Sequence, residues 1–256
     1  MISHTSQKGN KMRNIKLTIE YDGKEFHGWQ KQPGKLNIQG TIEKAIEHIT
    51  GEQVDLMASG RTDRGVHALG QVANFKTNSK LPIDKFPIAL NSNLKSAIRI
   101  KDAEEVPEKF HSRLSCKRKT YRYIINNSKY GTAIYRSQET HIPQKLDVGK
   151  MKEAVRYFEG EHDFKAFKSS GTSSKSSVRT IYKAEVKEMP NERIYIELTG
   201  NGFLYNMVRI ISGTLVDVGL GKIEPQEIET ILKSLDRTKA GKTLQPQGLY
   251  LLNVEY

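Results

Sequence analysis

Apolar residues recur with two different periods along this chain, and this mixture of periods limits the possible folds more than any other feature. Residues 15–21 alternate between apolar and polar side chains, which is typical of a half-buried β-strand. Residues 42–49 follow the spacing of an amphipathic helix, which we expect Thr41 to cap and Gly51 to end. The same patterns predict further strands at 66–75, 119–125, 180–186, 193–199 and 249–256, and helices at 148–158, 203–218 and 225–235. The chain is therefore predicted to be an α+β protein.

Strands and helices occur in both halves of the chain, which indicates two related α+β units, although no internal repeat is evident. We place the boundary near Phe110, so that residues 13–110 form an N-terminal half and residues 111–256 a C-terminal half. Residues 1–12 are polar and lack the apolar core of a signal peptide, and we expect a disordered leader there. The serine-rich segment 169–177 is expected to be a flexible loop.

The balance of charges points to a polyanionic partner. The 256 residues include 41 Lys and Arg against 29 Asp and Glu, a formal charge of +12. Counterion release from a polyphosphate favours binding to such a surface, so nucleic acid is the expected partner. A basic surplus also keeps many proteins soluble, and by itself it is weak support for this choice. No run of about 18 apolar residues and no basic amphipathic helix with a wide apolar face is present, so no membrane partner is expected.

Cysteine usage and two incomplete motifs limit the cofactors. Cys116 is the only cysteine, which excludes a disulfide framework and any zinc site with two or more thiolates, and the reducing cytoplasm is the expected location. The segment 240–243 ends like a phosphate loop but lacks its first glycine. The segment 219–221 lacks the third glycine of a dinucleotide fingerprint. The sequence therefore indicates neither nucleotide hydrolysis nor a dinucleotide-binding loop.

The run from Gly60 to Ala68 carries the most distinctive chemistry. It places Asp63 between Arg61 and Arg64, in a segment bounded by glycines. A neighbouring guanidinium lowers the pKa of a carboxyl and keeps it ionised, and glycines let the backbone approach a ligand closely. Asp63 is thus predicted to be a permanent anion. The spacing is equally compatible with an ordinary surface loop, whose Arg–Asp pair contributes at most about 1 kcal/mol.

This run closely resembles the signature loop of the tRNA pseudouridine synthase A family, Gly-Arg-Thr-Asp-x-Gly-Val-His-Ala. The resemblance covers nearly all of the chain from Arg13 to Tyr256, and it departs from the family pattern at Arg64, where many members carry alanine. Further matching segments stand in the order of the family: Tyr21-Asp22-Gly23, Gly28-Trp29-Gln30, Ile38-Gln39-Gly40, Tyr121-Arg122-Tyr123, Gly160-Glu161-His162-Asp163-Phe164 and Asn206-Met207-Val208-Arg209.

The resemblance implies a role for four residues. Asp63 matches the catalytic nucleophile, Tyr121 the aromatic residue that stacks on the target base, and Arg209 the arginine that pairs with the carboxylate and orients it. Arg61 matches a position that reaches the RNA backbone or replaces the flipped base. A uridine in a stem must leave the stack before its glycosidic bond is rearranged, and an aromatic platform is worth about 1–3 kcal/mol per base. Without the resemblance, Tyr121 would be interpreted as a cross-strand or core aromatic residue and Arg209 as a solvated helix residue.

A dense basic stretch lies beside the predicted stacking tyrosine. This basic stretch could bind the phosphates that flank a bound stem, and it consists of Arg113, Lys117, Arg118, Lys119 and Arg122. A solvated run of charges is the alternative interpretation. Arg64 adds positive charge beside Asp63, facing either RNA or solvent.

Three histidines complete the candidates for acid–base chemistry: His67, His111 and His162. Isolated histidines are more often structural than catalytic, so we assign them no catalytic role.

The resemblance also implies the architecture and the reaction. It implies two ferredoxin-like (RNP-like) halves that share one long, mainly antiparallel central sheet, with helices packed on one side and the active cleft across the middle. It implies a homodimer that binds the anticodon stem-loop of tRNA and isomerises uridine to pseudouridine at positions 38 to 40 without a cofactor.

Two questions stay open at this stage. Asp63 would attack the base at C6 or assist at C1′ of the sugar, and both courses are forms of carboxylate catalysis. Two other functions also fit parts of the sequence: a non-catalytic RNA-binding protein of the same fold, and a different RNA-modifying enzyme such as a methyltransferase, which the missing cofactor loop disfavours.

Overall fold

The computed structural model describes residues 12–171 and 176–256. Nearly all of the predicted leader, residues 1–12, and the middle of the predicted serine-rich loop lie outside these residues. Ten strands and five α-helices are present among the described residues. The strands are β1 (Arg13–Tyr21), β2 (Met57–Ala58), β3 (His67–Thr77), β4 (Ile98–Val106), β5 (Arg118–Asn126), β6 (Thr140–His141), β7 (Gly160–Asp163), β8 (Val178–Met189), β9 (Arg193–Gly200) and β10 (Leu249–Glu255).

All ten strands belong to one sheet. The order along it is β4-β1-β3-β10-β5-β9-β8-β7, with β2 paired to β3 and β6 paired to β5. Most neighbours are antiparallel, whereas β10 runs parallel to β3 and β6 runs parallel to β5. The α+β class with a long, mainly antiparallel central sheet is thereby confirmed.

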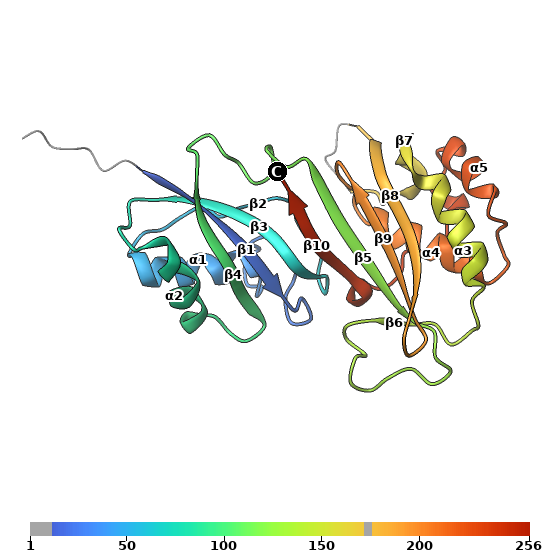
Figure 1. Cartoon of the computed structure of the whole chain (residues 1–256), viewed down its shortest axis with the longest axis horizontal. Coiled ribbons are helices and arrows are strands. Elements are labelled where there is room, and N and C mark those ends of the chain that lie inside the picture. The colour runs from blue at the N-terminus through green and yellow to red at the C-terminus, as the bar shows by residue number, and fades with distance from the viewer. Residues whose placement is uncertain (1–11, 172–175) are drawn as a thin grey trace, which may run out of the picture.

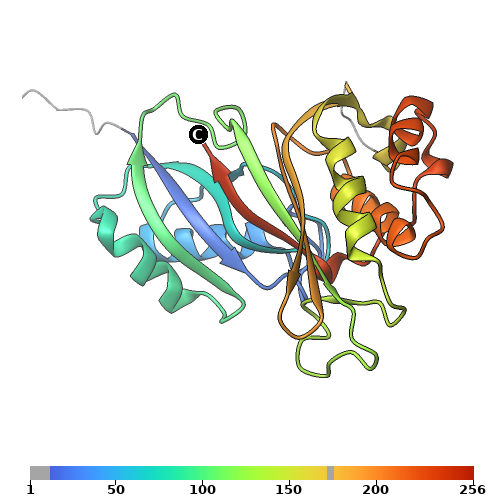
Figure 2. The ribbon, with the colours of Figure 1, turned by 45° about the vertical axis from the view of Figure 1, so that its right-hand side comes forward.

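Five α-helices flank this sheet in two groups: α1 (Ile38–Thr50), α2 (Phe86–Asn93), α3 (Val148–Val155), α4 (Met207–Gly219) and α5 (Glu227–Ser234). Helices α1 and α2 lie beside β4, β1 and β3 at one end of the sheet, and α3, α4 and α5 lie beside β5, β8 and β7 at the other end (Figures 1 and 2). Strand β10 lies between the two groups in both views.

The register of the strands places two key tyrosines on the same face of the sheet. Tyr21 of β1 is paired with Ala68 of β3, and Leu251 of β10 is paired with both Ala68 and Tyr121 of β5. Tyr121 is in turn paired with Leu198 of β9. Directly paired residues of neighbouring strands point to the same face. This face therefore runs without interruption from the first half of the chain to the second, and all five of these residues are buried on it.

The apolar side of each helix closes the core against this face. Ile42 and Ile46 of α1 are fully buried in the same cluster as Leu17 of β1. Ile210 of α4 and Tyr123 of β5 are buried in that cluster as well. Each half of the chain buries its helices on one side of the shared sheet, as the family resemblance implied.

Two sequence predictions about helix starts are wrong. Helix α1 begins at Ile38 instead of Thr41, because the side chain of Asn37 caps it by accepting a hydrogen bond from Gly40 N at 2.8 Å. Its predicted end is confirmed, since Gly51 adopts the left-handed conformation with φ of 73°.

The second error concerns α4, which was predicted from residue 203. It begins at Met207, after Asn206 with φ of 61°, so Phe203 is not part of its apolar face. Strand β4 and helix α2 were not predicted from the sequence. The burial pattern of β4 does not alternate in its second half, which explains why no strand period is visible there.

Candidate active site

The polar run predicted to carry the chemistry forms the loop between β2 and β3. Trp29 N donates a hydrogen bond to Thr62 O at 3.0 Å, and Val66 N closes a turn onto Asp63 O at 3.1 Å. A side chain at Gly28 would meet Thr62 O at 2.6 Å, so only glycine lets the neighbouring chain approach the loop this closely. Asp63 is therefore presented by a loop whose backbone is held from both sides.

A buried polar network lies beneath this loop. The Tyr21 hydroxyl is 2.7 Å from Thr62 Oγ1, and Gln71 Nε2 donates to Gly60 O at 2.9 Å. Ser59 Oγ donates to Gln71 Oε1 at 2.7 Å. All of these side chains are buried. Buried polar groups that satisfy one another hold a unique geometry, so the network fixes the loop before any ligand binds.

Asp63 faces an arginine from the other half of the chain. Arg209, in the first turn of α4, places Nη1 3.8 Å from Asp63 Oδ2. That separation is too long for a hydrogen bond but close enough for an ion pair. The guanidinium itself is held by two other acceptors, Leu244 O at 2.7 Å from Nε and Asn206 Oδ1 at 2.6 Å from Nη1.

Burial and charge act on Asp63 in opposite directions. Its side chain is 39% exposed. Burial raises the pKa of the Asp63 carboxyl above its usual value, and the Arg209 guanidinium lowers that pKa by less. The expectation that Arg61 and Arg64 hold the pKa of Asp63 low is therefore wrong. The charge that acts on the carboxyl comes from Arg209, because folding brings this residue to the loop, whereas both flanking arginines are exposed.

Tyr121 lies near Asp63 on the same side of the sheet. Its ring is 8% exposed, and Phe203 packs edge-on against it with ring centroids 5.0 Å apart. Burial raises the pKa of Tyr121, and the charge of Asp63 acts in the same direction. The structure thus brings together Asp63, Arg209 and Tyr121, three residues far apart in the sequence.

The sequence of this chain is similar to those of known proteins. A family model described as tRNA pseudouridine synthase matches residues 17–114 and 154–256. The chain belongs to the tRNA pseudouridine synthase family.

Relatives match over their whole length. A protein of Caldicellulosiruptor bescii named tRNA pseudouridine synthase A is 57% identical over 245 residues, which cover 96% of this chain and 100% of the relative. Proteins of the same name from Ruminiclostridium cellulolyticum and Clostridium acetobutylicum are 53% and 49% identical with the same coverage. Among solved structures, an archaeal chain from a box H/ACA sRNP Nop10–Cbf5 complex aligns with 92% of this chain and 46% of its own. Its TM-score of 0.34 and identity of 12% are too low for any comparison of sites.

In this pseudouridine synthase family member, the predicted basic stretch does not form one surface. The side chain of Lys119 lies on the same face of β5 as Tyr121. Its Nζ donates a hydrogen bond to Ser59 O at 2.5 Å, beneath the Asp63 loop. Arg118 and Arg122 lie on the opposite face, where Arg118 packs over the Tyr182 ring at 4.7 Å and Arg122 pairs with a glutamate. Burial lowers the pKa of Lys119. This lysine therefore braces the loop, and only the exposed members of the stretch are open to a ligand.

The cations nearest the loop are open to solvent. Arg61, Arg64 and Lys117 are exposed, and none of them forms an ion pair with a described carboxylate. Their charges are therefore available to a polyanion.

Three contributors to the site were missed in the sequence, and a fourth was given another role. Tyr21 and Gln71 look like ordinary strand residues, and Phe203 was placed on the apolar face of the helix predicted over residues 203–218. Lys119 was assigned to phosphate binding. The only available signal was the motif Tyr21-Asp22-Gly23, which marks the segment without revealing the contact with Thr62.

Histidine positions support a structural role for His67. It is buried, and its ring stacks on Tyr250 with centroids 4.7 Å apart. Among the described residues, no group of three or more His, Cys, Asp or Glu side chains is arranged to hold a metal ion. Within the same part of the chain, every helix is too short or too polar to cross a membrane.

Proposed function

We propose that this chain is an isomerase that converts uridine to pseudouridine in tRNA, at positions 38 to 40 of the anticodon stem-loop. The observation that carries the proposal is the half-exposed Asp63 carboxylate, held by a satisfied buried network and faced by Arg209 from the other half of the chain. A base that has left its stack can be held by an aromatic ring while a preorganised anion next to that ring reacts with the nucleotide.

The proposed roles follow from the contacts. Asp63 is the nucleophile, acting at C6 of the base or at C1′ of the sugar, and Arg209 keeps the carboxylate charged and oriented. Tyr121 supplies the ring on which the target base stacks. Because Tyr121 is nearly covered and Phe203 packs against it, the base would have to displace Phe203 to stack on that ring. Arg61 and Arg64, both exposed, would meet the RNA backbone.

The proposed chemistry is an isomerisation. The bond from C1′ to N1 of the base breaks, the base turns, and a bond from C1′ to C5 forms, while the C5 proton leaves and N1 gains one. No atom is added and no electron is lost overall, so the proposal includes no metal or organic cofactor.

We also propose a homodimer that works in the cytoplasm. The family resemblance supports the dimer, and the single cysteine suits a reducing compartment. Light scattering of the purified protein would measure the oligomeric state directly.

The test of the proposed function is Asp63→Asn. An amide is nearly the same size as the carboxylate but far less nucleophilic, so product formation on an unmodified tRNA transcript should disappear while tRNA affinity stays the same or rises slightly. The melting temperature at pH 7 should be unchanged or slightly higher. The raised pKa of Asp63 means that its ionised form, present at pH 7, is less favourable in the folded protein than in the unfolded chain.

Asp84→Asn is the matched control, because Asp84 is an exposed carboxylate in the short 3-10 helix before α2. It should leave turnover as in the wild type. Pseudouridine formed by Asp63→Asn at the wild-type rate would contradict the catalytic role and favour a non-catalytic RNA-binding protein.

A further inference from the structure

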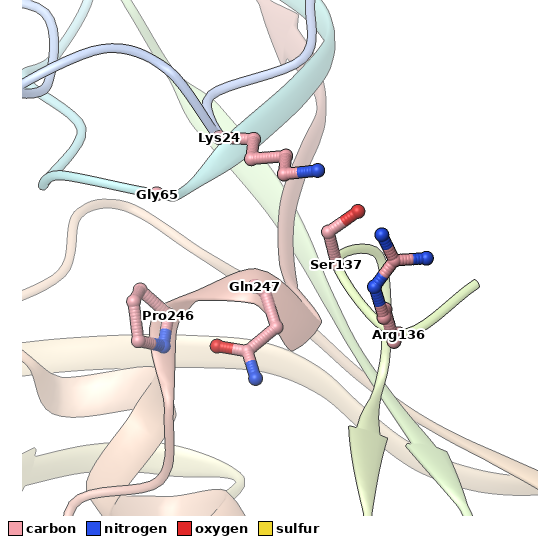
Figure 3. A pocket seen from close by; sticks show the side chains of 6 residues that line it. All are labelled: Lys24, Gly65, Arg136, Ser137, Pro246 and Gln247. Carbon is pink, nitrogen blue, oxygen red and sulfur yellow. The ribbon is translucent and has the colours of Figure 1, made fainter. Parts of the chain in front are cut away.

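A small pocket lies directly beside the Asp63 loop. Four segments form it: the turn after β1, the loop itself, the connection between β5 and β6, and the turn before β10. The side chains and backbone that line the pocket belong to Lys24, Gly65, Arg136, Ser137, Pro246 and Gln247 (Figure 3).

Two cations extend over this pocket. In Figure 3, Lys24 and Arg136 enter from different segments and both extend toward Ser137. Both side chains are exposed, and neither forms an ion pair with a carboxylate among the described residues. One guanidinium N–H of Arg136 donates to Ala133 O at 2.5 Å, which leaves most of its five donors free. Charges that have no partner within the protein are available to an external anion.

The segment that carries Arg136 is fixed to β3 and β10. His67 Nε2 is 3.0 Å from Ser137 O, and the Tyr250 hydroxyl donates to Gln138 O at 2.7 Å. His67 Nδ1 accepts from Gly23 N at 3.2 Å, next to Lys24. The buried His67 ring therefore ties together the two segments that supply the cations. The backbone of both segments is therefore held in place before a ligand binds, which lowers the entropic cost of binding.

The other wall belongs to the loop of the nucleophile. Gly65 is two residues from Asp63, which limits their separation along the chain to about 7 Å. A side chain at Gly65 would lie 3.1 Å from Pro246 Cγ, so the loop packs closely on the turn before β10. An anion in this pocket would lie within about one nucleotide of a base held at Asp63.

We propose that Lys24 and Arg136 bind one backbone phosphate of the RNA strand that carries the target uridine, in the pocket beside Gly65. This inference rests on the proposed function, since it is the uridine at Asp63 that brings this phosphate to the pocket. A planar guanidinium and an ammonium group together match the oxygens of a phosphodiester.

The first experiment measures binding of an unmodified anticodon stem-loop RNA by the double variant Lys24→Gln, Arg136→Gln over a range of salt concentrations. Its dissociation constant should rise about threefold to tenfold. The slope of log affinity against log salt should become shallower by about 0.7 to 0.9, the value for one lost phosphate contact. The control variant Lys152→Gln, Arg156→Gln removes two exposed cations from α3 and the turn after it, and it should keep the wild-type slope.

The second experiment replaces single phosphates near the target uridine with neutral methylphosphonates. Wild-type protein should lose affinity at one linkage, and the double variant should be insensitive at that same linkage. Equal sensitivity of the two proteins at every linkage, or an unchanged salt slope in the double variant, would overturn the phosphate assignment.

Product formation by the wild-type protein on the same RNA separates the two proposals. If pseudouridine forms but the two proteins respond equally to the methylphosphonate at every linkage, only the assignment of a phosphate to this pocket is wrong. If no pseudouridine forms, the proposed function fails, and the linkage scan still decides whether the pocket binds a phosphate.

Discussion

At the scale of single residues, Asp63 combines two opposing influences. Partial burial raises the pKa of its carboxyl, and Arg209 is the charge that limits this rise. The guanidinium is anchored by Leu244 O and Asn206 Oδ1 and approaches the carboxylate only to 3.8 Å. It therefore acts as a fixed charge rather than as a hydrogen-bond donor, and its main effect should be visible in the pH dependence of the reaction.

We predict that Arg209→Gln moves the acidic limb of the pH–rate profile to higher pH. Without the positive charge the pKa of Asp63 rises further, so the proposed nucleophile becomes protonated, and inactive, at a higher pH than in the wild type. Single-turnover rates measured between about pH 4 and pH 8 would show the shift. Arg209→Lys keeps the charge and should shift the limb less. An acidic limb that is the same in all three proteins would show that Arg209 does not act on Asp63.

Tyr121 should be needed for its ring rather than for its hydroxyl. We predict that Tyr121→Phe keeps most of the tRNA affinity and the wild-type stability, because no hydrogen bond of this hydroxyl is present in the structure among the described residues. Tyr121→Ala should lose turnover by a large factor, and it should also lower the free energy of unfolding by about 3–5 kcal/mol through the cavity it leaves.

A second variant separates these two effects. Tyr121→Leu fills most of the space without a ring, so it should fold with only a modest loss of stability and still lose turnover. Melting temperature and single-turnover rate would be measured on the same preparation. If the leucine variant keeps the wild-type turnover, Tyr121 does not stack on the target base and serves only to pack the core.

At the scale of secondary-structure elements, the junction of β3 and β10 joins the two halves of the sheet. The register between β1 and β3 shifts between Ile19 and Tyr21, and the register between β10 and β5 shifts between Leu251 and Asn253. These irregularities meet at Gly70, where an added Cβ would lie 2.4 Å from Leu252 O. The close approach of the two strands thus depends on glycine at this position.

Gly70→Ala should therefore weaken the connection between the halves. Forcing the strands apart should lower the free energy of unfolding by about 1–3 kcal/mol, and turnover should fall as well, because β3 carries the Asp63 loop and β5 carries Tyr121. Thermal unfolding and single-turnover rates would measure both effects. Gly149→Ala is the control. It lies in the first turn of α3, where an added Cβ would meet only the capping Asp147 Oδ1, at 3.2 Å, and not the backbone of another strand, so alanine there should change the melting temperature little. Equal melting temperatures for the two variants would contradict the proposed role of Gly70.

At the scale of the whole molecule, the formal charge of +12 should control RNA binding. We predict that tRNA affinity falls steeply with salt concentration, because each phosphate contact releases counterions, whereas stem-loops of the same shape but different sequence should bind with similar affinity. Filter binding or fluorescence anisotropy over a salt series would give the slope. A flat titration would count strongly against an electrostatic mode of binding.

The sequence by itself determined the local features of this protein. The period of residues 15–21 and of 119–125 predicted β1 and β5 correctly, because alternation along a strand depends only on the strand itself. The end of α1 at Gly51 was also predicted correctly, because the left-handed conformation there depends on that glycine alone. The signature run around Asp63 identified the loop, and the family comparison agrees with it.

Only the tertiary structure decided how these parts act on one another. The strand that ends the structure, β10, lies between β3 and β5, and this order is invisible in local periodicity. The partner of Asp63 is Arg209 and not its sequence neighbours, and Lys119 braces the loop instead of facing solvent. Desolvation and Coulomb interactions depend on distances through space, and contacts between residues more than a hundred positions apart are set by how the sheet closes around its core.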